Sequence, residues 1–279
     1  MEKFSLLQNL IKREGIATAA NSFRPGRAKL KLLEAAHCPD YLQRFCSGTL
    51  TQKELRRLGL PWSEGLLRRS LLAPVGTLLA GQLALKFGIA CHLAGGTHHA
   101  HYDFGSGFCV INDLAVAAIN LQRSGLTKRI LIFDCDVHQG DGTAAILSGF
   151  TDIFTCSLHC EKNFPARKAQ SDLDVPLPKG MTDYEYLETV KKTFVHLLDR
   201  LKPDLVFFDA GVDVYSADPL GLLDISYEGL VEREYAVLAE CKARGVPVAT
   251  VIGGGYDDDR AALVDRHALV VRAAHKLWA

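Results

Sequence analysis

Three acids and a histidine lie within eight residues near the middle of the chain, a combination that suits metal chemistry. Asp134, Asp136 and His138 follow a strand predicted over residues 129–133, and Asp141 comes shortly after. Side chains of an extended segment alternate faces, so a D-x-H pair can hold one cation from one side. A helix cap would need only one acid, and these groups would repel one another without a cation. The segment therefore predicts a metal site.

A further carboxylate, Asp213, follows another predicted strand and would complete an Asp-His-Asp ligand set with Asp136 and His138. Three protein ligands leave coordination positions open, which is typical of catalytic sites. The donor set favours Zn²⁺, and Fe²⁺ is the open alternative. We expect Asp209 and Asp218 to be turn or supporting residues.

Tandem histidines, His98 and His99, follow a Gly-Gly turn. A single histidine at such a place is more often a hydrogen-bonded core residue. Beside a metal, however, a pair can take a proton from water and deliver one to a leaving group. Asp134 and Asp141 are the natural partners for the far nitrogen of each ring. We expect His101 at the surface.

Aromatic residues next to glycines suggest how a substrate would be held. Residues 253–255 are glycines that could form a flexible turn, or could let backbone approach a ligand closely. In the second case the phenol of Tyr256 would lie near the metal, where it could donate to a developing oxyanion. Phe108 and Phe164 could face each other across a narrow channel that admits a slim aliphatic chain, although each ring alone is more typical of a core.

Strands alternate with helices along the chain. We predict strands over residues 89–93, 129–133, 152–157, 204–209 and 246–252. We predict helices over residues 3–14, 39–45, 51–60, 66–87, 110–122, 144–147, 182–201, 227–243 and 260–276, with a short element over 28–36. This alternation predicts a three-layer α/β fold with a mostly parallel sheet and helices on both faces. The carboxyl ends of such strands form one crevice, so the clusters that follow them should converge on one site.

Composition limits the class of protein. At 279 residues with 48% hydrophobic residues, the chain can fill one large core, so we expect a single domain over residues 1–279. The 32 basic and 32 acidic residues cancel, which gives no electrostatic reason to expect nucleic acid or a membrane as partner. No uninterrupted apolar run approaches the roughly 20 residues that span a bilayer.

The cysteines and the first residues bear on the compartment. Several of the eight cysteines fall in apolar runs, and none forms paired C-x-x-C motifs. The first residues, Met-Glu-Lys-Phe, are charged and lead into an amphipathic pattern rather than a signal peptide. We expect a cytoplasmic protein with reduced cysteines.

Together these segments resemble the zinc-dependent histone deacetylase family of the arginase-deacetylase fold. The matching segments are Thr97-His-His-Ala, Gly107-Phe-Cys109 with Asn112, Asp134-x-Asp-x-His-x-Gly-Asp-Gly142, Ser157-Leu-His159, Ala210-Gly-Val-Asp213 with Asp218-Pro219, and Gly253-Gly-Gly-Tyr256. They keep the family's order from about residue 37 to about residue 257 and are together highly specific. Gln139 stands where many members have a second histidine, so the chain resembles the class IV branch and its bacterial relatives.

The resemblance implies a role for each matching position. The implied zinc ligands are Asp136, His138 and Asp213. The implied catalytic residues are His98 and His99 as the acid-base pair, Tyr256 as the oxyanion donor, and the supporting acids Asp134 and Asp141. The implied channel residues are Gly107, Phe108, Phe164 and Leu220. The resemblance also implies a structural K⁺ held by Asp134, Asp136, His138, Ser157 and Leu158, partly through backbone carbonyls.

The start of the chain departs from the family. Members usually begin with a strand and a loop before the first helix, whereas here Met1 already begins that helix. We expect either that the sheet lacks a strand or that the start lies upstream. Both would affect stability and one wall of the pocket.

The function that follows is hydrolysis of an N-acyl lysine in a protein or peptide, or of a small acylated amine, to the free amine and a carboxylate. The alternatives are an acylated polyamine or a long-chain fatty acyl-lysine as substrate, and a non-catalytic acyl-lysine-binding scaffold. An arginase-like dinuclear site is disfavoured, because one D-x-H and one further Asp do not supply ligands for a second metal. The sequence says nothing about oligomeric state.

Overall fold

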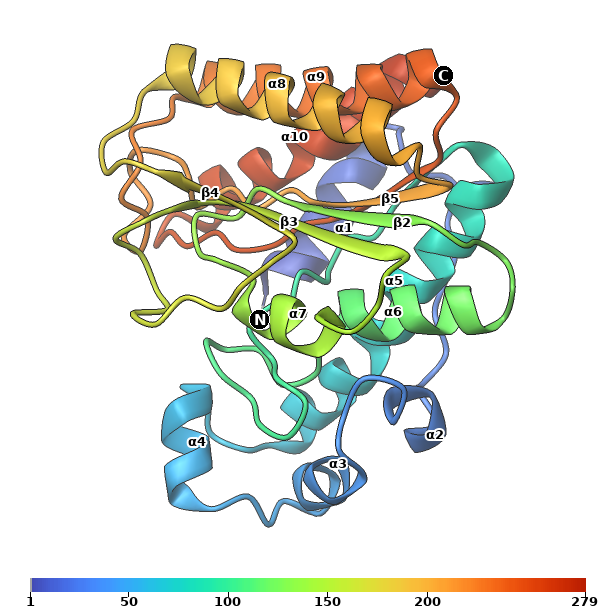
Figure 1. Ribbon diagram of the computed structural model, residues 1–279, viewed down its shortest axis with the longest axis vertical. Helices are drawn as coiled ribbons and strands as arrows, with labels where there is room; N and C mark the ends of the chain where they lie inside the picture. Colours follow the sequence, from blue (N-terminus) through green and yellow to red (C-terminus); the bar gives the residue numbers. More distant parts are fainter. Residues whose placement is uncertain (1) are drawn as a thin grey trace.

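A parallel sheet lies at the centre of the computed structural model, which describes residues 2–279 (Figure 1). Its strands are β1 (Ile89–Cys91), β2 (Ile130–Asp134), β3 (Ile153–Cys160), β4 (Leu173–Leu177), β5 (Leu205–Asp209) and β6 (Val248–Val251). Within the described chain they lie in the order β1-β6-β5-β2-β3-β4, and each neighbouring pair is parallel. The predicted α/β class is confirmed.

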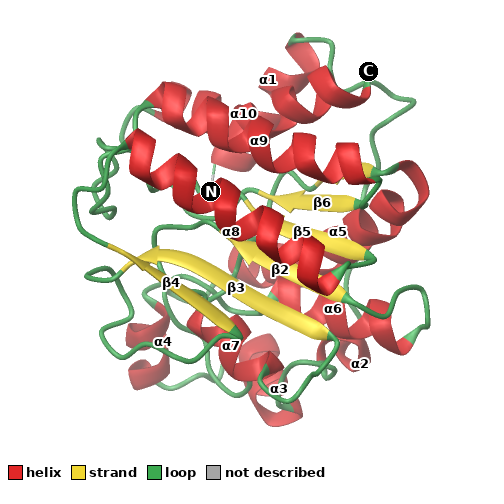
Figure 2. Ribbon diagram, turned by 45° about the horizontal axis from the view of Figure 1, so that its top comes forward, coloured by secondary structure: helices red, strands yellow, loops and turns green. Residues whose placement is uncertain are grey.

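Helices cover both faces of this sheet (Figures 1 and 2). They are α1 (Lys3–Arg13), α2 (Leu30–Leu33), α3 (Pro39–Ser47), α4 (Gln52–Leu58), α5 (Glu64–Phe87), α6 (Asp113–Arg123), α7 (Asp141–Leu147), α8 (Asp183–Leu201), α9 (Tyr227–Arg244) and α10 (Arg260–Trp278). One apolar core joins the sheet to α1, α8, α9 and α10, and a second joins it to α2, α3, α5, α6 and α7. The three predicted layers are therefore present.

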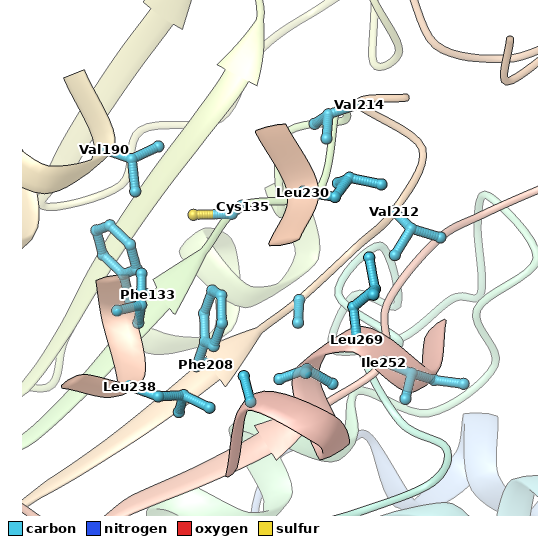
Figure 3. Close-up of a cluster of buried hydrophobic side chains, with 14 of the residues drawn as sticks. Phe133, Cys135, Val190, Phe208, Val212, Val214, Leu230, Leu238, Ile252 and Leu269 are labelled. Carbon is cyan, nitrogen blue, oxygen red and sulfur yellow. The ribbon is translucent and has the colours of Figure 1, made fainter. Parts of the chain in front are cut away.

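The central strands divide their side chains between these two cores. Phe133 and Phe208 belong to the first core, whereas Ile132 and Phe207, one residue away, belong to the second. Figure 3 shows Phe133 and Phe208 among side chains such as Leu238 from the covering helices. Burial of each such side chain contributes about 1.5–3 kcal/mol. Because both faces are buried, these strands are continuously apolar in sequence.

The strand order fixes where a ligand can bind. From β2 the chain moves outward to β3 and β4, and then returns to the other side of β2 for β5 and β6. The order reverses between β2 and β5. In open parallel sheets the crevice outside the carboxyl ends of two such strands is the binding site.

Two elements differ from the sequence-based expectation. Strand β4 was not predicted, because Pro176 interrupts its apolar pattern and most of its residues are only half-buried. Proline is tolerated there because β4 is an edge strand. Helix α7 begins at Asp141 rather than at residue 144, so Asp141 lies in the first turn of a helix.

Helix α5 is long and apolar enough, by length and composition, to cross a membrane. In this fold it packs against α6, β1 and β6 instead, and its buried residues Leu66, Leu71, Ala80 and Ala84 belong to the second core. The eight cysteines of the chain are free thiols.

Candidate metal centre and active site

The three predicted metal ligands meet at the reversal point of the sheet. Asp136 and His138 follow β2 and Asp213 follows β5, and all three are buried. His138 Nδ1 lies 3.0 Å from Oδ1 of Asp136 and 3.2 Å from Oδ2 of Asp213. One ligand atom from each residue lies within 4.8 Å of the others. The cluster therefore presents one imidazole nitrogen and two carboxylate oxygens to a single point.

The electrostatics of this cluster fit a cation. Burial raises the pKa of Asp213 to about 7, and the nearby charge of Asp136 adds to the shift. Burial opposes a charge on His138, but its hydrogen bonds to Asp136 and Asp213 raise its pKa to about 10. Without a cation, protons held by Asp213 and His138 thus limit the repulsion between the buried groups. A bound divalent ion would replace those protons, and one nitrogen with two oxygens suits Zn²⁺ or Fe²⁺.

Backbone groups fix the carboxylates. Oδ2 of Asp136 accepts from the backbone N–H of Gly254 at 2.6 Å, and Oδ1 of Asp213 accepts from that of Val137 at 2.9 Å. A Cβ on Gly254 would overlap the carboxylates of both Asp136 and Asp213. Of the two roles predicted for the glycine run, a flexible turn or a close approach of the backbone to the site, the structure therefore shows the close approach.

The tandem histidines lie beside this cluster, with ring centroids 4.2 Å apart. His98 Nδ1 lies 2.7 Å from Oδ2 of Asp134, and His99 Nδ1 lies 2.6 Å from Oδ1 of Asp141. Burial opposes a charge on His98, but Asp134 and Asp136 raise its pKa well above its ordinary value. Burial and the charge of His98 lower the pKa of His99 to about 4. The pair thus consists of a charged imidazole, His98, beside a neutral one, His99.

His101, expected at the surface, is half-buried. Its side chain is 20% exposed, and Nε2 lies 3.0 Å from Oδ2 of Asp141. Its exposure is reduced because the side chain contacts Asp141, which lies in the first turn of α7.

A second cluster joins His98, Asp134 and Asp209, with ligand atoms within 4.8 Å of one another. Asp209 is fully buried, and neither of its carboxylate oxygens has a hydrogen-bond partner in the structure. Burial raises its pKa well above the ordinary value, and Asp134 adds to the shift. The sequence signal is that Asp209 ends a predicted strand, and in the sheet it lies in register with Asp134. Ser157 lies on the other side of Asp134 in the sheet.

A cavity of about 980 Å³ lies over the cluster of Asp136, His138 and Asp213, which are part of its lining. The predicted channel residues Gly107, Phe108, Phe164 and Leu220 all line it. Phe108 and Phe164 are 41% and 45% exposed, so their rings border open space rather than the core. A Cβ on Gly107, at φ +50°, would strike the ring of His99, so only glycine allows this loop so close to the acid-base pair.

Tyr256 lies on the same cavity. Its backbone N–H donates to Oδ2 of Asp218 at 2.7 Å, which gives Asp218 the expected supporting position. Burial raises the pKa of Tyr256 well above its ordinary value, and the nearby charge of Asp213 adds to the shift. The phenol therefore keeps its proton and is available as a donor.

Sequence reasoning missed the part of the cavity wall that comes from the first third of the chain. These lining residues are Lys3, Phe4, Arg57, Leu58, Gly59, Leu60, Pro61, Ser63, Leu66 and Arg69. Lys3 Nζ lies 3.4 Å from the carbonyl oxygen of Gly255, and burial lowers the pKa of Lys3 to about 8. These residues carry no motif, because a helix that packs on the cavity has the same amphipathic pattern as any other helix.

Comparisons with known proteins agree with this geometry. The model of the histone deacetylase domain matches residues 1–271. An uncharacterized protein of Picosynechococcus sp. is 50% identical, over 100% of this chain and 93% of that protein. The acetoin utilization protein AcuC of Staphylococcus aureus is 29% identical over 91% of this chain and 71% of its own length. Histone deacetylase 2 of Arabidopsis thaliana is 32% identical over 65% of this chain and 48% of its own length. The crystal structure of an HDAC homolog complexed with SAHA matches with a TM-score of 0.84 at 26% identity, over 98% of this chain and 77% of that one.

Proposed function

The chain belongs to the histone deacetylase family of hydrolases, and from this premise we propose that it hydrolyses the amide of an N-acyl lysine. The products are the free lysine amine and a carboxylate. One observation carries the proposal: the cluster of Asp136, His138 and Asp213 lies on a large cavity beside His98 and His99.

Asp136, His138 and Asp213 would hold the cation, which we propose to be Zn²⁺, with Fe²⁺ as the alternative that the same donors fit. When bound, the ion supplies Lewis acidity that polarises the amide carbonyl and makes water more acidic. We further propose a structural K⁺ beside Asp134 and Ser157, held also by backbone carbonyls of Asp136, His138 and Leu158. The carboxylate of Asp209, which lies next to Asp134 and has no hydrogen-bond partner, supports a cation in this region.

The two histidines have different roles: His99 transfers protons, and His98 stabilises charge. Neutral His99, whose Nδ1 is held by Asp141, takes a proton from the attacking water at Nε2. His98, kept charged by Asp134 and Asp136, stabilises the negative charge that develops on the substrate. The imidazolium of His99 then gives its proton to the amine as the carbon–nitrogen bond breaks.

Tyr256 and the channel residues act on the substrate. The phenol of Tyr256 donates to the oxygen of the tetrahedral intermediate. Phe108 and Phe164 border the aliphatic part of the lysine, and the ring of Phe164 lies 4.9 Å from that of His99. A lysine chain that contacts Phe164 would therefore have its reacting end next to His99.

The charges that line the cavity favour acyl-lysine over an acylated polyamine. Lys3, Arg57 and Arg69 contribute positive charge on the cavity wall, and neither Lys3 nor Arg69 forms an ion pair within the described chain. A polycationic substrate would be repelled there. A non-catalytic scaffold is disfavoured because every acid-base position and every ligand position is occupied by a competent side chain.

The test is metal content measured together with hydrolysis of two peptides, one with acetyl-lysine and one with a long-chain acyl-lysine. In Tyr256→Phe we expect the metal to stay and kcat to fall by about 10²–10³, the usual cost of losing one oxyanion donor. Tyr184→Phe, at a residue that is 78% exposed, is the matched control. Near-normal turnover in Tyr256→Phe would refute its role, and absence of turnover with either peptide in the metal-loaded protein would refute the proposed substrate.

A further inference from the structure

Each carboxylate oxygen of Asp141 lies within hydrogen-bond distance of an imidazole nitrogen. Oδ1 lies 2.6 Å from Nδ1 of His99, and Oδ2 lies 3.0 Å from Nε2 of His101. The carboxylate is buried, with only 9% of its side chain exposed, so water does not readily replace either partner. Burial alone would favour the neutral acid, but the hydrogen bonds from His101 and His99 hold the pKa of Asp141 well below its usual range. Asp141 is thus an anion fixed from two sides.

His101 is held in a defined orientation for this contact. Its ring stacks on Phe104 with centroids 4.4 Å apart and planes inclined by 18°. The guanidinium of Arg57 lies 4.4 Å from the centroid of the same Phe104 ring. The backbone N–H of His101 also donates to the carbonyl of Phe104 at 2.9 Å. These contacts restrain the ring, so the hydrogen bond to Asp141 costs little additional side-chain entropy.

The partner of the other histidine is fixed in a different way. Asp134 contacts His98 through Oδ2, and its Oδ1 accepts from the backbone N–H of Asp136 at 3.0 Å. A backbone group therefore orients the carboxylate of one pair, whereas a side chain, His101, orients that of the other. A carboxylate with a single partner can rotate and tilt the imidazole that it holds, and such supporting contacts are commonly worth 10–100-fold.

We propose that His101 is a positioning residue for the acid-base pair: by donating to Oδ2 of Asp141, it fixes the carboxylate that orients His99. This inference rests on the proposed hydrolysis, because His99 is the base of that reaction. His101 does not line the cavity and so acts on substrate only through Asp141 and His99. Its loss should change kcat rather than KM.

The experiment compares three substitutions of His101 in the metal-loaded protein. His101→Phe keeps a ring to stack on Phe104 but removes the donor, and His101→Ala removes both. In His101→Gln the side-chain amide can donate in place of Nε2. We expect kcat for an acetyl-lysine peptide to fall about tenfold in the Phe and Ala variants, with KM unchanged within about a factor of two, and to return to within about threefold of wild type in the Gln variant.

Tyr102→Phe, at the neighbouring residue that is 54% exposed, is the control, and metal content and Tm are recorded for every variant. Unchanged kcat in a folded Phe or Ala variant overturns the proposal. Equal loss in the Gln variant also overturns it, because a restored hydrogen-bond donor would then fail to rescue turnover. If the wild-type protein itself fails to turn over the peptide, the proposed hydrolysis fails instead.

Discussion

The floor and the wall of the cavity are built in opposite ways. The floor, formed by Asp136, His138 and Asp213, follows central strands, is at most 9% exposed, and is fixed by backbone N–H groups. The wall is formed by Phe108, Phe164 and other side chains from loops and helix ends, and these rings are 41–45% exposed. The floor is therefore restrained by the whole sheet, whereas each part of the wall depends on one segment. Changes in the floor should abolish chemistry, and changes in the wall should alter which substrate is preferred.

The largest effect is expected from Asp213→Asn in the floor. The side chain is fully buried, and the substitution removes one of two carboxylate ligands. We expect most of the metal to be lost and activity to fall on the order of a thousandfold or more, because the ion supplies several kcal/mol of transition-state stabilisation. Elemental analysis and turnover give the result, with Asp204→Asn, at a half-exposed residue just before β5, as control. Unchanged metal content would show that Asp213 is not a ligand.

A smaller effect concerns the stability of the floor without metal. The hydrogen bonds of His138 to Asp136 and Asp213 outweigh burial and raise its pKa from 6.5 to about 10. A raised pKa in the folded state stabilises the protein fully below pH 6.5, and this stabilisation is lost as the pH rises through about 10. A bound metal requires neutral His138 and so removes this dependence.

We therefore expect the Tm of the metal-free protein to fall across this range, so that the Tm difference from the loaded protein widens. Calorimetry at the two ends of the range measures this difference. The loaded protein is the control, because its His138 does not titrate. If the Tm difference between the metal-free and the loaded protein stays constant, His138 does not titrate against Asp136 and Asp213 in this range.

The smallest effect is expected from Phe164→Ala in the wall. The ring is half-exposed and packs edge-on against His99 at 4.9 Å, so truncation removes apolar contact with the substrate but no ligand or acid-base group. We expect KM to rise by about tenfold, equivalent to about 1.4 kcal/mol of lost contact, with kcat within a fewfold of wild type. Phe23→Ala, at a residue that is 53% exposed and outside the cavity, is the control. A large fall in kcat with unchanged KM would instead place Phe164 with the floor.

The same contrast explains what could be predicted from the sequence. Asp136, His138 and Asp213 were identifiable because the chemistry restricts each position to a few residue types at a fixed distance from a strand end. Strand β4 was missed because Pro176 at a sheet edge is compatible with a loop as well as a strand. Lys3 and Arg69 were missed because their place on the cavity depends on how α1 and α5 pack, which no local pattern records.

Helix α1 lies beside α10 (Figure 2), and its residues Lys3 and Phe4 line the cavity. An ion pair between Glu14 and Arg272, with Nε 3.0 Å from the carboxylate, joins the far end of α1 to α10. Most residues of the segment 15–29 that follows are exposed. A ligand that contacts Phe4 gains that contact when α1 is docked, so occupancy and docking are thermodynamically linked. Ligand binding in the cavity should therefore protect segment 15–29 from a protease, although this segment does not line the cavity.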